Sequence, residues 1–356
     1  MFFCVIILPV RKISIKNRIF FSIFICICLL TGGCGNKQII ITTGFWEDEI
    51  FRVEDSHCVK AEVMVYLYNL HEQYERSFGN GIWNAGGAEV DLKKNLKQTV
   101  LARLAKIKLM NIMAGRFQVA LGDADKAKAQ QAAGMYYSSL SPAELELMNG
   151  ITEEKLEKMY EEYAVADLLY DKLTESVDTE ISDDEARVVR LHQIALLWEK
   201  LGDDGVIVRS TEEELNDKAA EIMEHLEAGE DFDTLAYTYN DAAAISVEMV
   251  KGVEAPGVEN LCFALAEGEV GGPVKGDDGI YIFKCISTYD RQQTDERKVK
   301  LANERKKESF DSRYEEFAAG EEIYLNEDLW QSIELEEISD KGNTDFFEIY
   351  ERFFGK

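Results

Sequence analysis

The sequence is poor in the residues that build metal clusters and disulfide frameworks. Of its seven cysteines, only Cys58, Cys262 and Cys285 lie beyond residue 34, and no Cys-x-x-Cys pair occurs. Its four histidines show no His-x-x-x-His spacing and no grouping with cysteine. Disulfide scaffolds use cysteine densely, and zinc sites need clustered ligands. We therefore expect no metal site and no cofactor. A bridge between Cys262 and Cys285 stays open, beside the simpler alternative of two buried apolar thiols.

Positive charge is also scarce. The chain has 39 Lys+Arg against 67 Asp+Glu, for a net charge of −28. Nucleic-acid binding depends on lysine and arginine neutralising phosphates, so this balance disfavours a nucleic-acid partner. The acidic surface favours solubility, and it could also attract basic partners or weakly bound Ca²⁺. A solvated acidic face is the simpler interpretation.

No apolar run is long enough to span a bilayer comfortably. The longest, residues 19–30, follows the basic stretch from Arg11 to Arg18 and precedes Thr31-Gly-Gly-Cys34. This order is typical of an export signal, which we place at residues 1–33. The apolar residues ahead of Val10 are unusual in front of such a signal and favour a translation start nearer Val10.

Small residues directly before a cysteine resemble the lipobox of bacterial lipoproteins. The resemblance implies cleavage before Cys34, lipidation of that residue, and a diacylglyceryl anchor that is stable because it carries two acyl chains. Ordinary secretion with an incidental cysteine is the alternative.

Helical periodicity dominates the next part of the chain. We interpret residues 34–49 as a tether and residues 50–186 as a mostly helical domain. Apolar residues recur at helical spacing over residues 59–78 and 92–117. Ser141-Pro-Ala-Glu144 is a capping box, and Thr152 can cap a further helix. Aromatic residues here favour a helix-bundle core, although an open apolar cradle for unfolded polypeptides is an alternative.

The pattern changes after residue 187. Val188–Leu196 predicts a strand, and Thr211-Glu-Glu-Glu214 begins a helix with a clear apolar face. Gly229-Glu-Asp-Phe-Asp-Thr-Leu-Ala follows, and Phe263-Ala-Leu-Ala-Glu-Gly-Glu-Val-Gly-Gly-Pro-Val then leads through a turn to an alternating strand at Ile280–Lys284.

These landmarks resemble, in order, those of parvulin-type peptidyl-prolyl isomerase domains, and the chain resembles foldases of the PrsA/SurA type. The resemblance implies an α+β protein. It would consist of the helical domain (50–186), an isomerase domain of small sheet and helices (187–288), and a C-terminal region (289–356) whose helix packs on the N-terminal domain. Self-association or client contact is the alternative for the aromatic C-terminal end.

The resemblance also implies site residues. The family orients its pocket with two histidines and places an aspartate or cysteine near the substrate carbonyl. His192 stands at the first histidine position, Tyr281 replaces the second histidine, and Asp241 matches the acidic position. A hydrogen bond between Tyr281 and His192 is expected. For His192, a satisfied core histidine is the alternative to a catalytic role.

The wall of the proline slot departs from the family pattern. Counted back from Phe263, its Met and Phe positions fall on Glu254 and Val258. We take Val258 and Phe263 as the client pocket. A buried, unpaired Glu254 would cost several kcal/mol there.

Three hypotheses from different classes follow. The first is an active prolyl isomerase on the extracytoplasmic face of the bacterial membrane, with unfolded exported polypeptides as partners. The second is a non-catalytic chaperone, and the third is a scaffold or ligand-binding lipoprotein that uses the acidic surface. Each of the three hypotheses is compatible with a homodimer.

Overall fold

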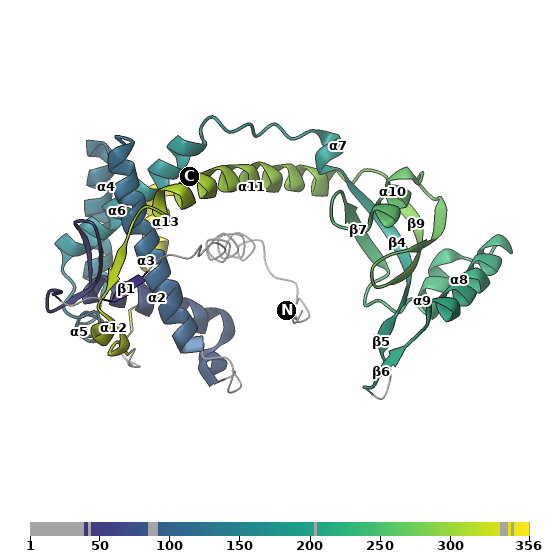
Figure 1. Cartoon of the computed structure of the whole chain (residues 1–356), viewed down its shortest axis with the longest axis horizontal. Coiled ribbons are helices and arrows are strands. Elements are labelled where there is room, and N and C mark those ends of the chain that lie inside the picture. The colour runs from purple at the N-terminus through teal and green to yellow at the C-terminus, as the bar shows by residue number, and fades with distance from the viewer. Residues whose placement is uncertain are drawn as a thin grey trace. The chain divides into compact units, whose positions relative to one another are not determined.

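A computed structural model describes residues 39–41, 44–84, 92–202, 205–334, 341–342 and 345–355. The expected signal peptide (1–33) and Cys34 lie outside these residues. The fold is α+β, as expected, and the chain forms two compact units (Figure 1). Unit 1 contains the described residues up to Ser176 and from Ser309 onward, and unit 2 contains Val177–Glu308.

Unit 1 contains a four-stranded sheet in the order β1-β10-β2-β3. Strand β1 (Ile39–Ile41) pairs in parallel with β10 (Ile323–Leu325), which pairs antiparallel with β2 (Glu49–Val53), and β2 continues into β3 (Ser56–Val59). The expected tether, residues 34–49, therefore contains a strand and the start of another. A three-residue strand is too short for its periodicity to be read from the sequence.

The rest of unit 1 is helical, as its apolar periodicity predicts. Ser141 and Thr152 cap α5 and α6 by accepting hydrogen bonds from the backbone N–H groups of Glu144 and Lys155. The helices of unit 1 are α2 (Lys60–Phe78), η1 (Asn80–Asn84), α3 (Leu92–Arg116), α4 (Asp123–Ser139), α5 (Pro142–Leu147), α6 (Glu153–Thr174), α12 (Glu327–Gln331) and α13 (Phe346–Phe354).

The aromatic C-terminal end lies inside unit 1. Phe346, at the start of α13, is fully buried, and its ring centroid lies 4.2 Å from that of Tyr160 and 5.6 Å from those of Tyr66 and Tyr136. Phe310, at the end of the long helix α11 (Arg291–Ala318), joins the same core. The aromatic end thus packs within the unit, the first of the two alternatives.

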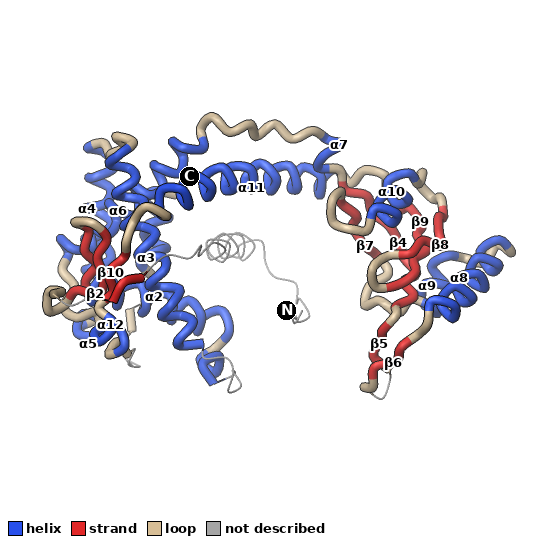
Figure 2. Tube along the Cα trace, viewed as in Figure 1, coloured by secondary structure: helices blue, strands red, loops and turns tan. Residues whose placement is uncertain are grey.

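Unit 2 is built on a second four-stranded sheet, in the order β7-β4-β9-β8, with antiparallel neighbours throughout (Figure 2). Its elements are α7 (Asp183–Ala186), β4 (Val188–Leu197), β5 (Glu199–Leu201), β6 (Ile207–Arg209), α8 (Glu212–Glu227), α9 (Phe232–Tyr239), β7 (Ser246–Val250), α10 (Pro256–Ala264), β8 (Val270–Lys275), β9 (Gly279–Ser287) and the first part of α11.

Unit 2 is longer than the expected range, residues 187–288. The added residues are held by contacts between α7 and α11: Arg305 pairs with Glu185 at 2.6 Å, and Lys298 pairs with Asp183. The backbone N–H of Val188 donates to the hydroxyl of the fully buried Thr294 on α11. Helix α11 therefore begins in unit 2 and ends in unit 1.

Helices cover both faces of the unit 2 sheet. Helices α8 and α9 pack on the face that carries Ile194 and Ile282, and α10 packs on the face that carries Leu191 and Phe283. Cys262 and Cys285 are free thiols in the α10-side core, where burial raises the pKa of Cys262 to about 12. A strand covered on both faces has few polar positions, so its sequence does not show which side chain faces which way.

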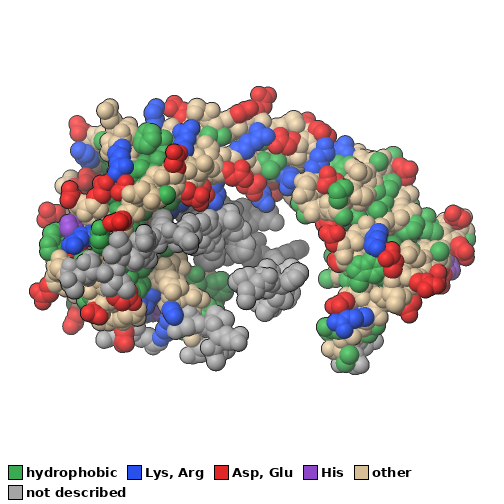
Figure 3. All heavy atoms as spheres, viewed as in Figure 1, with side chains coloured by type: hydrophobic (Ala, Val, Ile, Leu, Met, Phe, Trp, Pro, Cys, Tyr) green, Lys and Arg blue, Asp and Glu red, His purple; other side chains and the backbone are tan. Residues whose placement is uncertain are grey.

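Acidic side chains are spread over the visible surface of each unit in Figure 3. This dispersion favours a solvated acidic surface over a single concentrated cation site. Within the described ranges, no helix is both long and apolar enough to cross a membrane.

Candidate functional site

The register of β4 and β9 decides which predicted site residues meet. His192 lies opposite Lys284, and Ala195 lies opposite Tyr281. Successive side chains on a strand point to opposite faces. His192 therefore shares the α8/α9 face with Ile194 and Ile282, whereas Tyr281 lies on the α10 face.

The expected hydrogen bond between His192 and Tyr281 is therefore a wrong prediction. His192 Nδ1 lies 2.5 Å from Asp233 Oδ1 on α9, and Lys284 Nζ lies 3.3 Å from the other oxygen of that carboxylate. The hydrogen bond from His192 lowers the pKa of Asp233, and Lys284 adds to this effect against the opposing influence of burial. His192 thus links β4 to α9. This contact resembles the satisfied core histidine that was the alternative to a catalytic role.

Gln193 is the polar β4 residue on the α10 face, which it shares with Tyr281. It lies opposite Phe283, two residues from Tyr281 along β9, which makes the two side chains diagonal neighbours. Its amide Nε2 donates to the carbonyl of Ala244 at 2.9 Å. The sequence did not indicate Gln193 as a site residue. The neighbouring His192 was assigned to the first histidine position of the family, and this assignment drew attention away from Gln193.

Tyr281 is held in one orientation. Its hydroxyl donates to the carboxylate of Asp278, and its ring lies parallel to that of Phe283, with centroids 5.7 Å apart. Partial burial, followed by the hydrogen bond to Asp278, raises the pKa of Tyr281. The phenol therefore stays protonated at neutral pH.

Val258, on α10, lies beside Tyr281. A Cβ atom at Gly276 would be 2.8 Å from Tyr281 Cε2 and 3.4 Å from Val258 Cγ2, so both side chains lie against this glycine. Val258 is buried. Val258 and Tyr281 thus pack together beside Gly276, where a side chain would meet the Tyr281 ring.

Asp241 flanks β4 on the edge opposite β9. Its backbone N–H donates to the carbonyl of Ala195 at 2.8 Å. Its carboxylate accepts from Leu197 N at 3.2 Å and from Lys200 Nζ at 2.7 Å. The structure thus places Asp241 across β4 from Tyr281, with its carboxylate already paired.

Phe263 and Glu254 differ from expectation. The Phe263 ring lies 4.7 Å from the guanidinium of Arg187, whose Nη2 also donates to the Phe263 carbonyl, so Phe263 packs against a cation. Glu254 is exposed and incurs no burial penalty. The burial cost considered for Glu254 therefore does not arise.

The sheet and its covering helices form a small α+β domain. Residues 203–287 match the family model described as Rotamase, PPIC-type PPIASE domain, so the chain contains a domain of this family. The match confirms the predicted parvulin-type domain. It begins after β4, so His192 and Gln193 lie outside it.

Solved structures similar to the chain are foldases and related chaperones. Peptidylprolyl isomerase PrsA from Bacillus cereus is 17% identical, with 89% of this chain and 100% of that chain covered, at a TM-score of 0.36. Foldase protein PrsA from Streptococcus pneumoniae is 16% identical, with 86% and 100% covered, at 0.29. A structure described under SurA-like chaperones of Campylobacter jejuni is 11% identical, with 78% and 99% covered, at 0.28. No curated protein matches the chain. The assignment of the domain rests on the family model.

Proposed function

We propose that the chain is a foldase that assists the folding of exported polypeptides outside the cytoplasm by prolyl isomerisation, client holding, or both. The observation that carries the proposal is the rotamase match over residues 203–287. The α10 face of that domain, with Tyr281 and Val258, supports it as the surface that receives proline.

Prolyl isomerisation needs no bond to break. Rotation about the peptide bond faces a barrier of roughly 18–20 kcal/mol because the amide is conjugated. A catalyst needs an apolar surface for the proline ring and polar groups that fit the twisted amide better than the planar one. In this proposal Tyr281 contacts the ring, the buried Val258 supports Tyr281 from α10, and the Gln193 amide lies beside the carbonyl. His192 and Asp241 do not contact the proline in this proposal, and each bonds to a residue that flanks the sheet.

Exchange NMR on a proline peptide with the full chain tests isomerase activity. We expect exchange faster than the uncatalysed rate, and a Gln193→Ala variant slower than the parent by roughly tenfold, or about 1.4 kcal/mol of barrier. Gln292→Ala, on α11, is the matched control and should match the parent. Exchange at the uncatalysed rate in the parent chain would remove the isomerase.

Client holding has its own supporting observation. The β5–β6 hairpin exposes Leu201 (71%), Ile207 (56%) and Val208 (44%), and exposed apolar patches mark interaction surfaces. The chain should suppress aggregation of an unfolded client, measured by light scattering. The Leu201→Ser, Ile207→Ser double variant should lose most of this effect, whereas Val299→Ser, on α11, should keep it. Equal suppression by both variants would exclude the hairpin.

The membrane anchor and the assembly state belong to the proposal too. The Thr31-Gly-Gly-Cys34 order supports lipidation of Cys34. Metabolic labelling with a fatty acid should mark the parent protein and leave Cys34→Ser unlabelled, and labelling of both would contradict the anchor. Sedimentation equilibrium tests the homodimer.

A further inference from the structure

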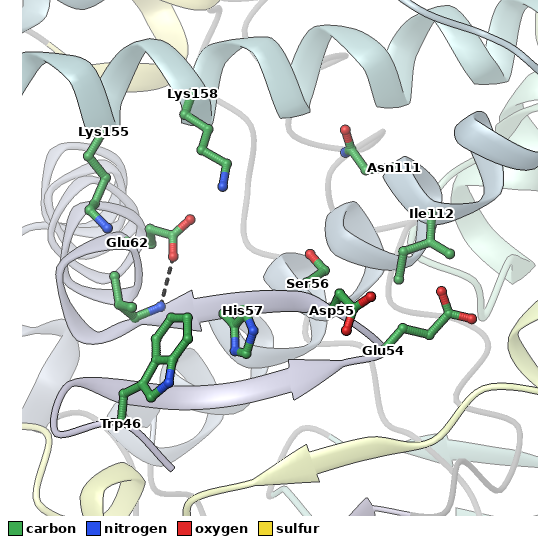
Figure 4. Close-up of a pocket in the computed structure, with 11 residues that line it drawn as sticks. Trp46, Glu54, Asp55, Ser56, His57, Glu62, Asn111, Ile112, Lys155 and Lys158 are labelled. Atoms are coloured by element: carbon green, nitrogen blue, oxygen red, sulfur yellow. Dashed lines mark hydrogen bonds between the residues drawn. The ribbon is translucent and has the colours of Figure 1, made fainter.

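A pocket of about 460 Å³ lies within unit 1 (Figure 4). Its walls come from Trp46 ahead of β2, the turn between β2 and β3, the end of α3, and the first turns of α6. Its volume is within the usual range for ligand sites. Apolar and polar side chains both line it.

The aromatic part of this pocket is held in place before any ligand binds. Trp46 is 58% exposed, yet its ring stacks on His57 with centroids 4.1 Å apart. His57 Nδ1 lies 2.8 Å from the buried carboxylate of Glu49, which also accepts from the backbone N–H of Trp46 at 2.9 Å. An exposed but ordered indole offers apolar contact area at low entropic cost.

Most charges around the pocket are already paired. Glu54 pairs with Arg116 at 2.6 Å, and the buried Glu62 pairs with Lys108 at 2.8 Å. Lys158 lies 3.9 Å from Glu162. These side chains stabilise the walls and leave little charge for a ligand.

Two pocket charges remain without a partner in the described part of the chain: the ammonium of Lys155 and the carboxylate of Asp55. Lys155 projects from α6 and Asp55 from the β2–β3 turn, on different walls of the pocket, as Figure 4 shows. Trp46 and His57 lie along a third side. The pocket therefore has a cationic side, an anionic side and an aromatic side.

We propose that this pocket binds an extended polypeptide segment in which a large apolar side chain is flanked by an acidic and a basic residue. The carboxylate pairs with Lys155, the apolar side chain packs on Trp46, and the cation pairs with Asp55. The inference rests on the proposed function, because it takes the ligand to be a client polypeptide. It adds a client site with a charge preference that does not require proline.

Terminally blocked tripeptides test the proposal on the full chain. Asp-Phe-Lys is the ligand, and Asn-Phe-Lys, Asp-Phe-Gln and Asp-Ala-Lys are its analogues. Binding is followed by the NMR signal of the Trp46 indole N–H and by tryptophan fluorescence. Trp46→Ala should weaken binding of Asp-Phe-Lys roughly tenfold. Because this variant lacks the indole, its binding is measured from the NMR signals of the peptide.

The charge variants provide the sharper test. Lys155→Gln should weaken binding of Asp-Phe-Lys about two- to fivefold and leave Asn-Phe-Lys unchanged. Asp55→Asn should weaken Asp-Phe-Lys by a similar factor and leave Asp-Phe-Gln unchanged. Lys126→Gln, on α4, is the matched control and should bind like the parent.

Three results would overturn the inference: no binding of Asp-Phe-Lys, equal binding by Trp46→Ala, or charge variants that weaken all peptides alike. Free phenylalanine binding as tightly as the peptide would also overturn it, because it would indicate a small-molecule site. The proposed function can fail separately. A chain that binds Asp-Phe-Lys here but neither isomerises proline nor holds clients would refute the proposed function alone. A chain that isomerises proline or holds clients but does not bind Asp-Phe-Lys would refute this site alone.

Discussion

At the scale of single residues, Lys108 is the most consequential buried charge of unit 1. It is 1% exposed, and its ammonium lies 2.8 Å from Glu62 and 2.7 Å from Glu162. Burial alone would lower its pKa, but the two carboxylates outweigh burial and raise it. Burial raises the pKa of Glu162 against the opposing effect of Lys108. One ammonium thus pairs with two acids and joins α2, α3 and α6.

Lys108→Met should destabilise unit 1 by about 3–5 kcal/mol, because it leaves the buried Glu62 without a cation and Glu162 with only Lys158, 3.9 Å away. Trp46, Trp83 and Trp330 report on this unit, so their fluorescence during urea unfolding measures the loss. Lys126→Met, on the exposed side of α4, is the control and should shift the midpoint little. A Lys108→Met midpoint equal to that of the control would show that the three charges do not stabilise the unit.

Asp233 gives a pH prediction for unit 2. Because its folded pKa is lowered, its contribution to stability is present above the unfolded value of about 3.9 and is lost as the pH falls through the folded value. In an NMR titration of its carboxyl carbon, His192→Leu should raise the Asp233 pKa. Tyr281→Phe should leave it unchanged, since Tyr281 lies on the other face. An equal effect from both variants would contradict the register of β4 and β9.

At the scale of elements, helix starts were the features best predicted from the sequence. The Thr211 capping box is present: its hydroxyl accepts from Glu214 N at 3.3 Å, and the Glu214 carboxylate accepts from Thr211 N at 2.8 Å. A cap is a local arrangement, so four residues suffice to predict it. Which face of the sheet a β4 side chain occupies depends on the register with β9, which is distant in the sequence, and on the geometry of the turns. His192 was therefore assigned to the wrong face. No local signal assigns Gln193 to its face.

Thr211→Ala should destabilise unit 2 by about 1 kcal/mol, because α8 loses its cap. Trp198 lies in unit 2, and its fluorescence during denaturant unfolding follows this unit. Thr211→Ser should retain the stability, since serine caps equally well. If the alanine and serine variants unfold together, the cap contributes nothing measurable.

The C-terminal helix α13 provides a second test at this scale. Phe346→Ala should cost unit 1 about 3–5 kcal/mol, because a fully buried ring that contacts three tyrosines is removed. Phe354, near the end of the same helix, is only partly buried, so Phe354→Ala should cost clearly less. Thermal unfolding followed by circular dichroism compares the two variants. A smaller loss for Phe346→Ala than for Phe354→Ala would contradict the packing of α13.

At the scale of the whole molecule, the sequence predicted the fold class and the presence of a rotamase domain. The ends of the two units were harder to predict. Helix α11 belongs to both units, and strand β1 joins a sheet whose other members include residues almost 300 positions later, as the pairing of Ile39 with Ile323 shows. Such long-range pairings leave no periodic trace in a short segment. The polar pocket at Trp46 was also unforeseen, because its walls come from four separated parts of the chain.

The central claim is that the α10 face of the rotamase domain, and not the His192 face, receives proline. Exchange NMR on a proline peptide, with Tyr281→Ala and His192→Ala compared side by side after each is shown to be folded by its amide spectrum, tests it most directly. The account predicts that Tyr281→Ala loses at least about tenfold in catalysed exchange, while His192→Ala keeps most of it. Loss of exchange in His192→Ala with retention in Tyr281→Ala would contradict the account.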